Sequence, residues 1–291
     1  MRRVTLRAYA KVNYALDVLG VRDDGCHEIR TVFQSISLCD EVSVEKAGSG
    51  FDIAVEPREI CPVEENTVYG AWRLLCERAG HELPVEVRLR KRIPSGAGLG
   101  GGSADAAAAL VGMNEMLGLG IEDGELRALA AKVGADVPFC LMGGTALGEG
   151  VGADLTALPA PPPHHIALAK PAASADTAKV YRAYDEHPRK SLAKTDAVVS
   201  ALRSGDLRSL GTSLGNDLTD VTSLFAPEVK AYARSFLESG ALGASMSGTG
   251  TAAYGIFDDG ERAKYALSKL EAPFSGVFEP VERGIETIDS A

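Results

Sequence analysis

The feature that most constrains this chain is a glycine-rich stretch that runs directly into alanines, PSGAGLGGGSADAAAAL at 94–110. Five glycines fall within the seven positions from Gly96 to Gly102. The preceding segment, VEVRLRKRI at 85–93, alternates apolar and polar residues and predicts a half-buried strand. A strand, a side-chain-poor loop and a helix start form an anion site, because backbone N–H groups face the ligand. The stretch therefore predicts a phosphate loop, and the small alanines let the helix lie close to a sheet.

Two common glycine-rich motifs match this loop less well. A Walker A loop ends in lysine and serine or threonine, and no lysine follows these glycines. A dinucleotide fingerprint matches at Gly96, Gly98 and Gly101, but it requires a following strand that ends in an acidic residue. The segment that follows here, 122–134, has a helical pattern instead. A turn without a ligand remains as the alternative, although five glycines make it costly to order.

The rest of the chain predicts a mixed α/β protein. Lys11 and Asn13 lie two apart in a strand pattern, so their side chains face the same way. The motif DDGCHE at 23–28 predicts a turn, and 240–257 predicts a glycine-rich turn between a helix and a strand. Strand patterns cover 4–19, two strands within 32–47, 85–93, a segment after Gly143, and 166–170. Helical patterns cover 66–80 with a cap at Gly80, 104–117 with a cap at Ser103, 122–134, 176–186 and several segments up to 239.

The proline-rich stretch LPAPPPHH at 158–165 is the strongest break in composition. It predicts a boundary between an N-terminal domain, 1–160, and a C-terminal domain, 161–291. Hydrophobic residues make up 45% of the 291 residues, which is enough for two cores.

Composition also excludes several classes of function. A net charge of −10 argues against general nucleic-acid binding, although one local cationic site still suits an anionic ligand. The chain shows no apolar run long enough to cross a membrane and no clear signal-peptide cleavage site. Its five cysteines are dispersed without a CxxC pair, and its five histidines lack metal-ligand spacing. These features predict a cytoplasmic protein with free thiols and no zinc site.

The glycine-rich stretch resembles the phosphate loop of the GHMP kinases. The blocks AYAKVNYALDVLGVRDDGCHEIRTVFQSISLCDEV, GADVPFCLMGGTALGEGVG and GASMSGTGTAAYGIF are similar to blocks of the branch that acts on a cytidine diphosphate-linked methylerythritol. The resemblance covers about residues 7–257. It implies an α+β, two-layer fold whose N-terminal domain binds ATP and whose C-terminal domain holds an antiparallel sheet, with the active site in the cleft between them. It also implies ATP-dependent phosphorylation of the substrate's 2-hydroxyl, with Mg²⁺, in non-mevalonate isoprenoid precursor biosynthesis.

The resemblance assigns the catalytic and nucleotide-binding roles. Asp136 matches a general base, and Lys11 matches the lysine that holds it ionised. The nucleotide cradle is Pro94, Ser95, Gly96, Ala97, Gly98, Leu99, Gly100, Gly101, Gly102, Ser103 and Ala104, with Ser103 touching Mg²⁺ or a phosphate oxygen. Asn66 and Lys91 match positions near adenine. From residue type alone, each has a plainer role: Ser103, Asn66 and Asp136 as caps, and Lys11 and Lys91 as exposed lysines.

The resemblance also assigns substrate contacts. Asn13 and His27 match polar contacts, with His27 on cytosine, and Thr177 and Tyr181 match a hydroxyl and an aromatic that touch the cytidine. Cys26 departs from the family, which usually has a stacking tyrosine there. We therefore expect weaker cytosine binding, by the ~1–3 kcal/mol typical of base stacking, unless Tyr181 or another aromatic such as Tyr14 compensates. Cys26 and His27 as ordinary turn residues are the alternative.

A second glycine-rich turn, 243–250, is expected to place backbone against the substrate phosphates. Gly248 and Gly250 would allow the close approach, and a plain connecting turn is the alternative.

Two rival functions stay open. Another small-molecule kinase of the same superfamily would lack the DGxHE turn together with Thr177 and Tyr181. A catalytically inactive ligand sensor is disfavoured by the presence of Lys11, Ser103 and Asp136. The sequence is compatible with a monomer or a homodimer that binds a small molecule, with no nucleic acid and no membrane.

Overall fold

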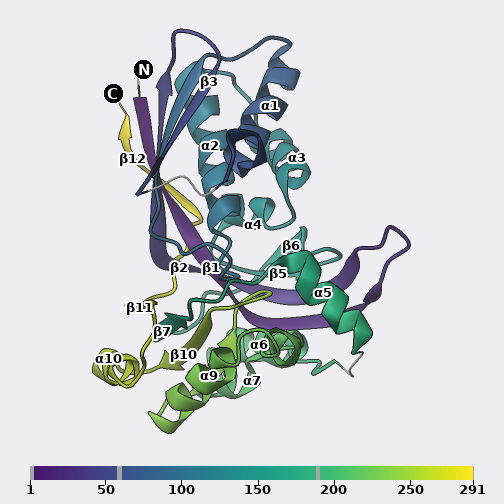
Figure 1. The fold of residues 1–291 in the computed structure, drawn as a ribbon, viewed down its shortest axis with the longest axis vertical. Coiled ribbons are helices and arrows are strands. Elements are labelled where there is room, and N and C mark those ends of the chain that lie inside the picture. The colour runs from purple at the N-terminus through teal and green to yellow at the C-terminus, as the bar shows by residue number, and fades with distance from the viewer. Residues whose placement is uncertain (1–2, 58–60, 188–190, 291) are drawn as a thin grey trace.

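The computed structural model describes residues 3–57, 61–187 and 191–290. One long antiparallel hairpin runs through both halves of the molecule (Figure 1). It pairs β1 (Arg3–Val21) with β2 (His27–Lys46). Register shifts at Tyr9/Ala10, Asn13/Ala15 and Val18/Gly20 interrupt the ladder, and such shifts let a long strand bend. The prediction of two strands within 32–47 is wrong, because the segment stays paired with β1 as a single strand.

Within residues 3–57, 61–187 and 191–290, the first sheet has eight strands, with the order β12-β1-β2-β4-β3 along its main path. Its further members are β5 and β6, which continue from β2, and β8, which pairs with β1. The remaining bounds are β3 (Phe51–Glu56), β4 (Val85–Arg90), β5 (Thr145–Glu149), β6 (Asp154–Ala157), β8 (Gly215–Asn216) and β12 (Ile285–Ser290). The predicted alternation in β4 is confirmed, since Val85, Val87 and Leu89 are buried and the residues between them are not.

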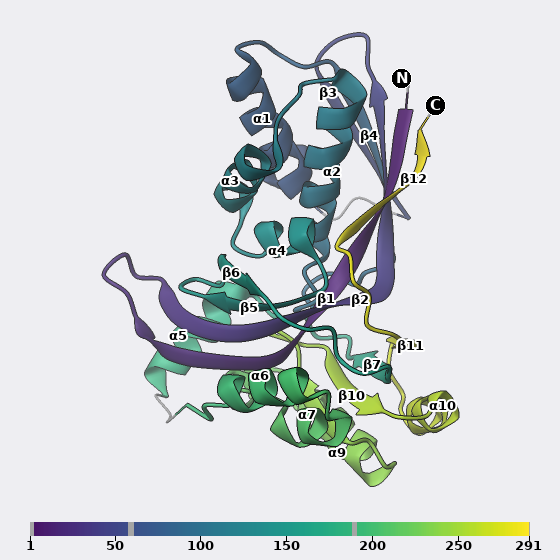
Figure 2. The same cartoon turned by 180° about the vertical axis from the view of Figure 1, so that it is seen from behind.

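Helices cover one face of this sheet (Figures 1 and 2). They are α1 (Thr67–Ala79), α2 (Gly101–Leu117), α3 (Asp123–Val133) and α4 (Val137–Met142), with a short 3₁₀ turn, η1 (Val63–Glu65), before them. The alanines of α2 are buried, and a Cβ at Gly112 would lie 2.8 Å from Leu6, so the helix packs tightly on β1. Gly80 caps α1 in the left-handed conformation, as predicted. Helix α4 was not predicted from the sequence.

The second sheet is antiparallel, as expected, with the order β11-β7-β10-β9. Its strands are β7 (His165–Lys170), β9 (Gly243–Met246), β10 (Ala253–Phe257) and β11 (Phe274–Phe278). The helices of this half are α5 (Thr177–Glu186), α6 (Thr195–Ser204), α7 (Leu207–Ser213), α8 (Thr219–Thr222), α9 (Glu228–Glu238) and α10 (Gly260–Ser268). The glycine-rich turn after β9 joins two strands, whereas a helix-to-strand turn was predicted.

The division proposed at residue 160 does not separate the sheets. β12 returns from the end of the chain to pair with β1, and Figure 1 places the two termini side by side. β8 also joins the first sheet, by pairing with Ala15 and Leu16 of β1. Within the described residues, no helix has both the length and the apolar character needed to span a bilayer.

Candidate active site

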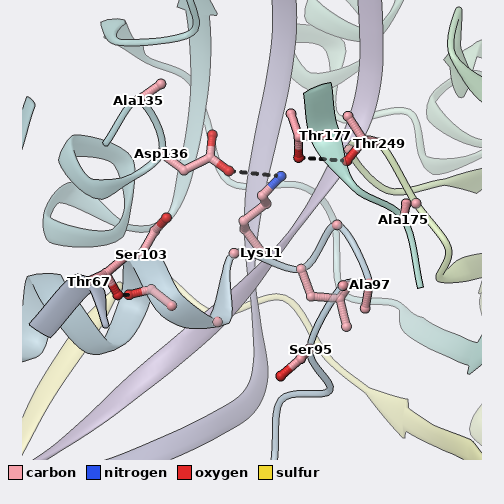
Figure 3. A pocket seen from close by; sticks show the side chains of 18 of the residues that line it. Lys11, Thr67, Ser95, Ala97, Ser103, Ala135, Asp136, Ala175, Thr177 and Thr249 are labelled. Atoms are coloured by element: carbon pink, nitrogen blue, oxygen red, sulfur yellow. Dashed lines mark hydrogen bonds and ion pairs between the residues drawn. The ribbon is translucent and has the colours of Figure 1, made fainter. Parts of the chain in front are cut away.

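A cavity of about 980 Å³ lies where the glycine loop, the β1–β2 hairpin, α5 and the turn after β9 meet. Figure 3 shows side chains from these separate parts of the chain around it. All the site residues predicted from the sequence line this cavity except Ala104, which is buried beside it. The cavity therefore brings the predicted nucleotide and substrate residues to one place.

The glycine loop reaches the second half of the molecule through its own backbone. Gly98 has a φ of +74°, and a Cβ there would lie 2.0 Å from the carbonyl oxygen of Ser247. The Ser247 hydroxyl donates to the carbonyl of Gly98 at 2.8 Å, and the N–H of Ala252 donates to the carbonyl of Ala97 at 3.0 Å. Glycine is required at position 98 because any side chain would separate these two loops.

The loop ends in the start of α2, which supplies donors for an anion. Gly100 is the N-cap residue, and the N–H of Ala104 is the first to bond within the helix, to the carbonyl of Gly100. The N–H groups of Gly101, Gly102 and Ser103 therefore have no intrahelical acceptor. Together with the helix dipole they form the positive end of a 17-residue helix that lines the cavity.

Ser103 is not the helix cap that the sequence pattern predicted. The helix begins at Gly101, because Gly100 adopts the left-handed conformation and turns the chain into the helix without a side-chain cap. Ser103 thus lies in the first turn, where Figure 3 shows its side chain beside the cavity. Its hydroxyl is placed for a ligand and does not cap α2.

Lys11 and Asp136 meet in the cavity although 125 positions separate them in sequence. The Lys11 Nζ lies 3.3 Å from Asp136 Oδ2, as the dashed line in Figure 3 marks. The Lys11 side chain is only 4% exposed, which rules out the exposed-lysine alternative, and that of Asp136 is 33% exposed. Asp136 occupies the N-cap position of α4, but its side chain makes no capping hydrogen bond. The carboxylate therefore faces the cavity, with the ammonium behind it.

Four neighbouring residues hold Lys11 in this position. Its N–H donates to the carbonyl of Leu99 at 3.0 Å, which joins β1 to the glycine loop. Its Nζ donates to Asn13 Oδ1 at 2.9 Å, and lies 5.3 Å from the centre of the Phe33 ring. A Cβ at Gly100 would lie 3.0 Å from Lys11 Cγ, so the loop rests directly on the lysine stem.

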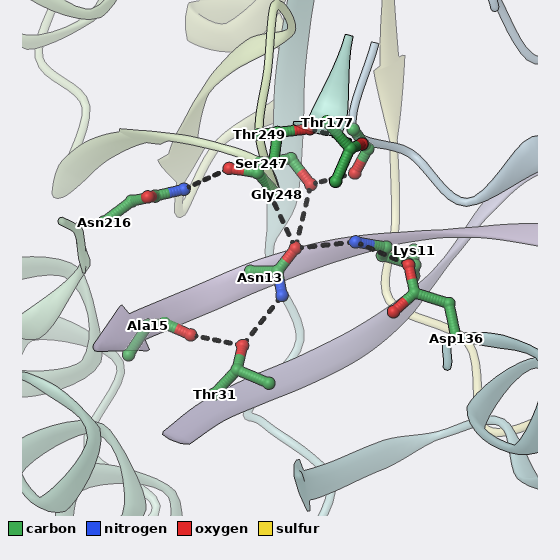
Figure 4. Close-up of polar contacts among 11 residues, drawn as sticks. Lys11, Asn13, Ala15, Thr31, Asp136, Thr177, Asn216, Ser247, Gly248 and Thr249 are labelled. Atoms are coloured by element: carbon green, nitrogen blue, oxygen red, sulfur yellow. Dashed lines mark hydrogen bonds and ion pairs between the residues drawn. The ribbon is translucent and has the colours of Figure 1, made fainter. Parts of the chain in front are cut away.

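Asn13 is buried, and its side chain bonds to the protein (Figure 4). Its Oδ1 also accepts the N–H of Gly248 at 2.9 Å, and its Nδ2 donates to Thr31 at 2.7 Å. One amide thus connects the catalytic lysine candidate with the turn after β9. Contact of Asn13 with a substrate stays a prediction.

Lys91 is neither exposed nor free. Its ammonium bonds to the carboxylates of Asp40 and Asp105, and none of the three side chains is more than 9% exposed. Asp40 also accepts the N–H of Ile93 at 2.8 Å. Burial raises the pKa of Asp105 to about 7, although Lys91 opposes this shift. Among the described residues, none hydrogen-bonds to Asp105 Oδ1.

Neither carboxylate of this cluster was predicted from the sequence. The sequence feature that could have indicated Asp105 is its position as the single charged residue in the alanine-rich segment 104–110. The cluster ties β2, the end of β4 and α2 together beneath the glycine loop.

Asn66 is the N-cap of α1, where its Oδ1 accepts the N–H of Val68 at 3.0 Å. The side-chain oxygen of Asn66 therefore caps the helix, as the alternative predicted. The residue also lines the cavity. The neighbouring Thr67 donates to the carbonyl of Gly102 at 2.7 Å, which fixes α1 against the start of α2.

The opposite end of the cavity holds the residues predicted to bind cytidine. The rings of His27 and Tyr181 stack with centroids 4.4 Å apart. Thr177 lies 3.3 Å from Thr249 between their hydroxyl oxygens (Figure 4). Cys26 is exposed at the hairpin turn. Tyr14 is not a replacement for the missing aromatic, because it is fully buried and bonds to His164 at 3.1 Å away from the cavity.

Comparison with known proteins agrees with this arrangement. The model of the GHMP kinases N terminal domain matches residues 66–144, and that of the GHMP kinases C terminal matches 198–276. The 4-diphosphocytidyl-2-C-methyl-D-erythritol kinase of Pelotomaculum thermopropionicum is 44% identical over 267 residues, which cover 91% of this chain and 93% of that protein.

Solved structures extend the comparison. A crystal structure of 4-(cytidine 5'-diphospho)-2C-methyl-D-erythritol kinase superposes with a TM-score of 0.79 at 34% identity, covering 95% of this chain and 98% of the other. A homoserine kinase from Cytophaga hutchinsonii superposes with a TM-score of 0.78 at 22% identity, covering 99% and 98%, which is a likeness of fold alone.

Proposed function

The chain belongs to the 4-diphosphocytidyl-2-C-methyl-D-erythritol kinases of the GHMP kinase superfamily, and we propose that the cavity described above is where it does this family's chemistry. It is an ATP-dependent phosphotransferase of non-mevalonate isoprenoid precursor biosynthesis. The acceptor is the 2-hydroxyl of the cytidine diphosphate-linked methylerythritol. The ion pair of Lys11 and Asp136 at the mouth of the glycine loop is the observation that carries this assignment.

The triphosphate lies along the glycine loop. The N–H groups of Gly101, Gly102 and Ser103 donate to phosphate oxygens, and the positive end of α2 stabilises their charge. Adenine occupies the end of the cavity near Asn66 and Lys91. The Lys91 ammonium is already shared by two carboxylates, so this residue acts on the nucleotide through its stem and backbone.

In the phosphoryl transfer, Asp136 is placed to accept the proton of the acceptor hydroxyl. The acceptor oxygen attacks the γ-phosphorus, the bond from that phosphorus to the β,γ-bridging oxygen breaks, and ADP leaves. The hydroxyl proton passes to the Asp136 carboxylate. Lys11 orients that carboxylate through the ion pair and offsets negative charge on the moving phosphoryl group.

Mg²⁺ fits the donors that the site offers. It prefers oxygen ligands and usually takes only one or two from the protein, with phosphates and water completing the shell. The Ser103 hydroxyl, in the first turn of α2, supplies such an oxygen at the cavity. When bound, the ion neutralises charge on the β- and γ-phosphates.

The cytidine lies at the end formed by His27, Tyr181 and Thr177, and the turn at Gly248 and Gly250 faces the substrate diphosphate. Cys26 supplies no ring, so stacking on that side is reduced. The expected result is a KM for the cytidine substrate above that of relatives with tyrosine at this position.

A coupled assay of ADP release tests the function. We expect turnover with ATP and the cytidine diphosphate-linked methylerythritol, and little with mevalonate or homoserine. Preferred turnover of either alternative alcohol would assign the chain to another small-molecule kinase. Substrate binding without turnover of any alcohol would support the inactive sensor.

A further inference from the structure

His27 contacts Asp185 of α5, a residue that has no role in the sequence-based predictions or in the proposed mechanism. Its Nε2 lies 2.8 Å from Asp185 Oδ1. Asp185 is four residues after Tyr181, so one face of α5 presents both a carboxylate and a ring to the same imidazole. The His27 side chain is 9% exposed, and all three residues line the cavity. The helix therefore holds the imidazole by its edge and by its face at once.

This contact determines which ring nitrogen carries the proton. An ionised carboxylate only accepts hydrogen bonds, so Nε2 is the donor. In the neutral ring, Nδ1 is then an acceptor with a free lone pair. No hydrogen bond to Nδ1 occurs within the described residues, and this nitrogen is the polar group that His27 has left for a ligand.

We propose that Asp185 is a specificity-determining positioning residue, which makes the cavity select cytosine by keeping Nδ1 of His27 as an acceptor. Cytosine presents an exocyclic amino group, which donates to such a nitrogen. Uracil presents a carbonyl oxygen at the same place, and two acceptors would then face each other in a mostly buried site. The inference rests on the proposed function, since it concerns the base of that substrate.

Selectivity between two substrates tests this role. We would measure kcat and KM for the cytidine substrate and its uridine counterpart, in the wild type and in Asp185→Ala and Asp185→Asn. For Asp185→Ala we expect the ratio of kcat/KM values, cytidine over uridine, to fall about tenfold. The loss should appear in KM, with kcat little changed, because the contact holds the base and not the reacting atoms. Asp185→Asn should retain part of the ratio, since its amide oxygen still accepts from Nε2.

A spectroscopic readout reports the tautomer directly. In ¹⁵N spectra of the imidazole, the wild type should show the proton on Nε2, and Asp185→Ala should show a mixture of tautomers. Glu186→Ala is the matched control, because it removes an exposed carboxylate one position further along α5, and it should leave the ratio unchanged.

Two results overturn the inference while leaving the kinase activity intact. One is an unchanged ratio in an active Asp185→Ala enzyme, and the other is a wild-type spectrum with the proton on Nδ1 of a neutral ring. Absence of wild-type turnover with the cytidine substrate would instead remove the proposed function itself. Should Asp185→Ala fail to fold, Asp185→Asn and the wild-type spectrum decide the question.

Discussion

At the scale of single residues, the site depends on charges that are kept out of water and paired. Lys11 is buried against Phe33 and the glycine loop, and the carboxylate of Asp136 faces it from another part of the chain. An unpaired buried ammonium would be costly, so Lys11 is stabilised by the carboxylate of Asp136. The pair is thus a structural contact, and in the proposed mechanism it also carries the chemistry of the site.

Replacing Asp136 by asparagine keeps its shape and removes the proton acceptor. We expect kcat to fall at least about a hundredfold, as is typical when a general base is lost, with a similar KM for ATP. Steady-state kinetics at saturating substrate measure this. Asp123→Asn, on the exposed start of α3, is the control and should keep full activity. A kcat for Asp136→Asn close to that of the wild type would remove Asp136 from the mechanism.

The cluster of Asp105, Lys91 and Asp40 predicts a pH-dependent stability. The folded protein raises the pKa of Asp105 from its ordinary 3.8 to about 7, mainly through burial. Between these values the folded state holds a proton that the unfolded state releases, so stability is lost as the pH rises through this window. Relative to Asp105→Asn, we expect the wild type to lose up to about 1.4 kcal/mol of unfolding free energy per pH unit, levelling above pH 7. Urea unfolding from pH 4 to 8 measures the difference, and a constant difference would contradict the shift.

At the scale of elements, two loops from different halves of the molecule interlock. The glycine loop before α2 and the turn between β9 and β10 bond to each other through Ser247 and Ala252. The glycine loop has no side chain at the closest point, Gly98. The shape of the proposed phosphate cradle is therefore a property of both elements together.

Gly98→Ala should disturb this contact. Its Cβ would overlap the carbonyl of Ser247, and its φ of +74° is unfavourable for alanine. We expect a loss of about 1–3 kcal/mol of stability and a raised KM for ATP. Gly124→Ala in α3, where a Cβ meets nothing within 4 Å, is the control and should keep the KM for ATP and leave stability equal or higher by up to ~1 kcal/mol. Equal behaviour of the two variants would mean that the loops are not held in contact.

At the scale of the whole molecule, the first sheet is completed by the end of the chain. β12 covers the edge of β1, and β8 pairs with the same strand further along. The core beneath the glycine loop also includes Ile166, Tyr254 and Ile256 from the second sheet. The two halves consequently share contacts that neither can make alone.

A fragment of residues 1–160 tests that dependence. It lacks β8, β12 and the turn that supports the glycine loop, so we expect no cooperative thermal unfolding transition and no ATP binding. The full chain should unfold in one transition that an ATP analogue moves to higher temperature. Cooperative unfolding of the fragment at a similar temperature would show that the boundary at 160 separates independent domains.

Local features were predictable from the sequence because neighbouring residues determine them. The cap at Gly80, the alternation in β4 and the order of strand, glycine loop and helix each depend on a few adjacent residues. The resemblance to the GHMP kinases added the pairing of Lys11 with Asp136, which no local pattern indicates.

Contacts between distant segments decided the rest. Residues 32–46 form one strand, where two were expected, because the segment pairs with β1. From residue type alone, Lys91 was expected to be exposed, but its ion pairs with Asp40 and Asp105 leave its side chain only 9% exposed. β12 pairs with β1 although at least 277 positions separate the paired residues, the smallest separation being that of Ala8 and Ile285. Such contacts depend on which surfaces meet when the chain folds. Short-range periodicity carries no information about them, because it reports the burial pattern of a segment and not the identity of the segment that covers it.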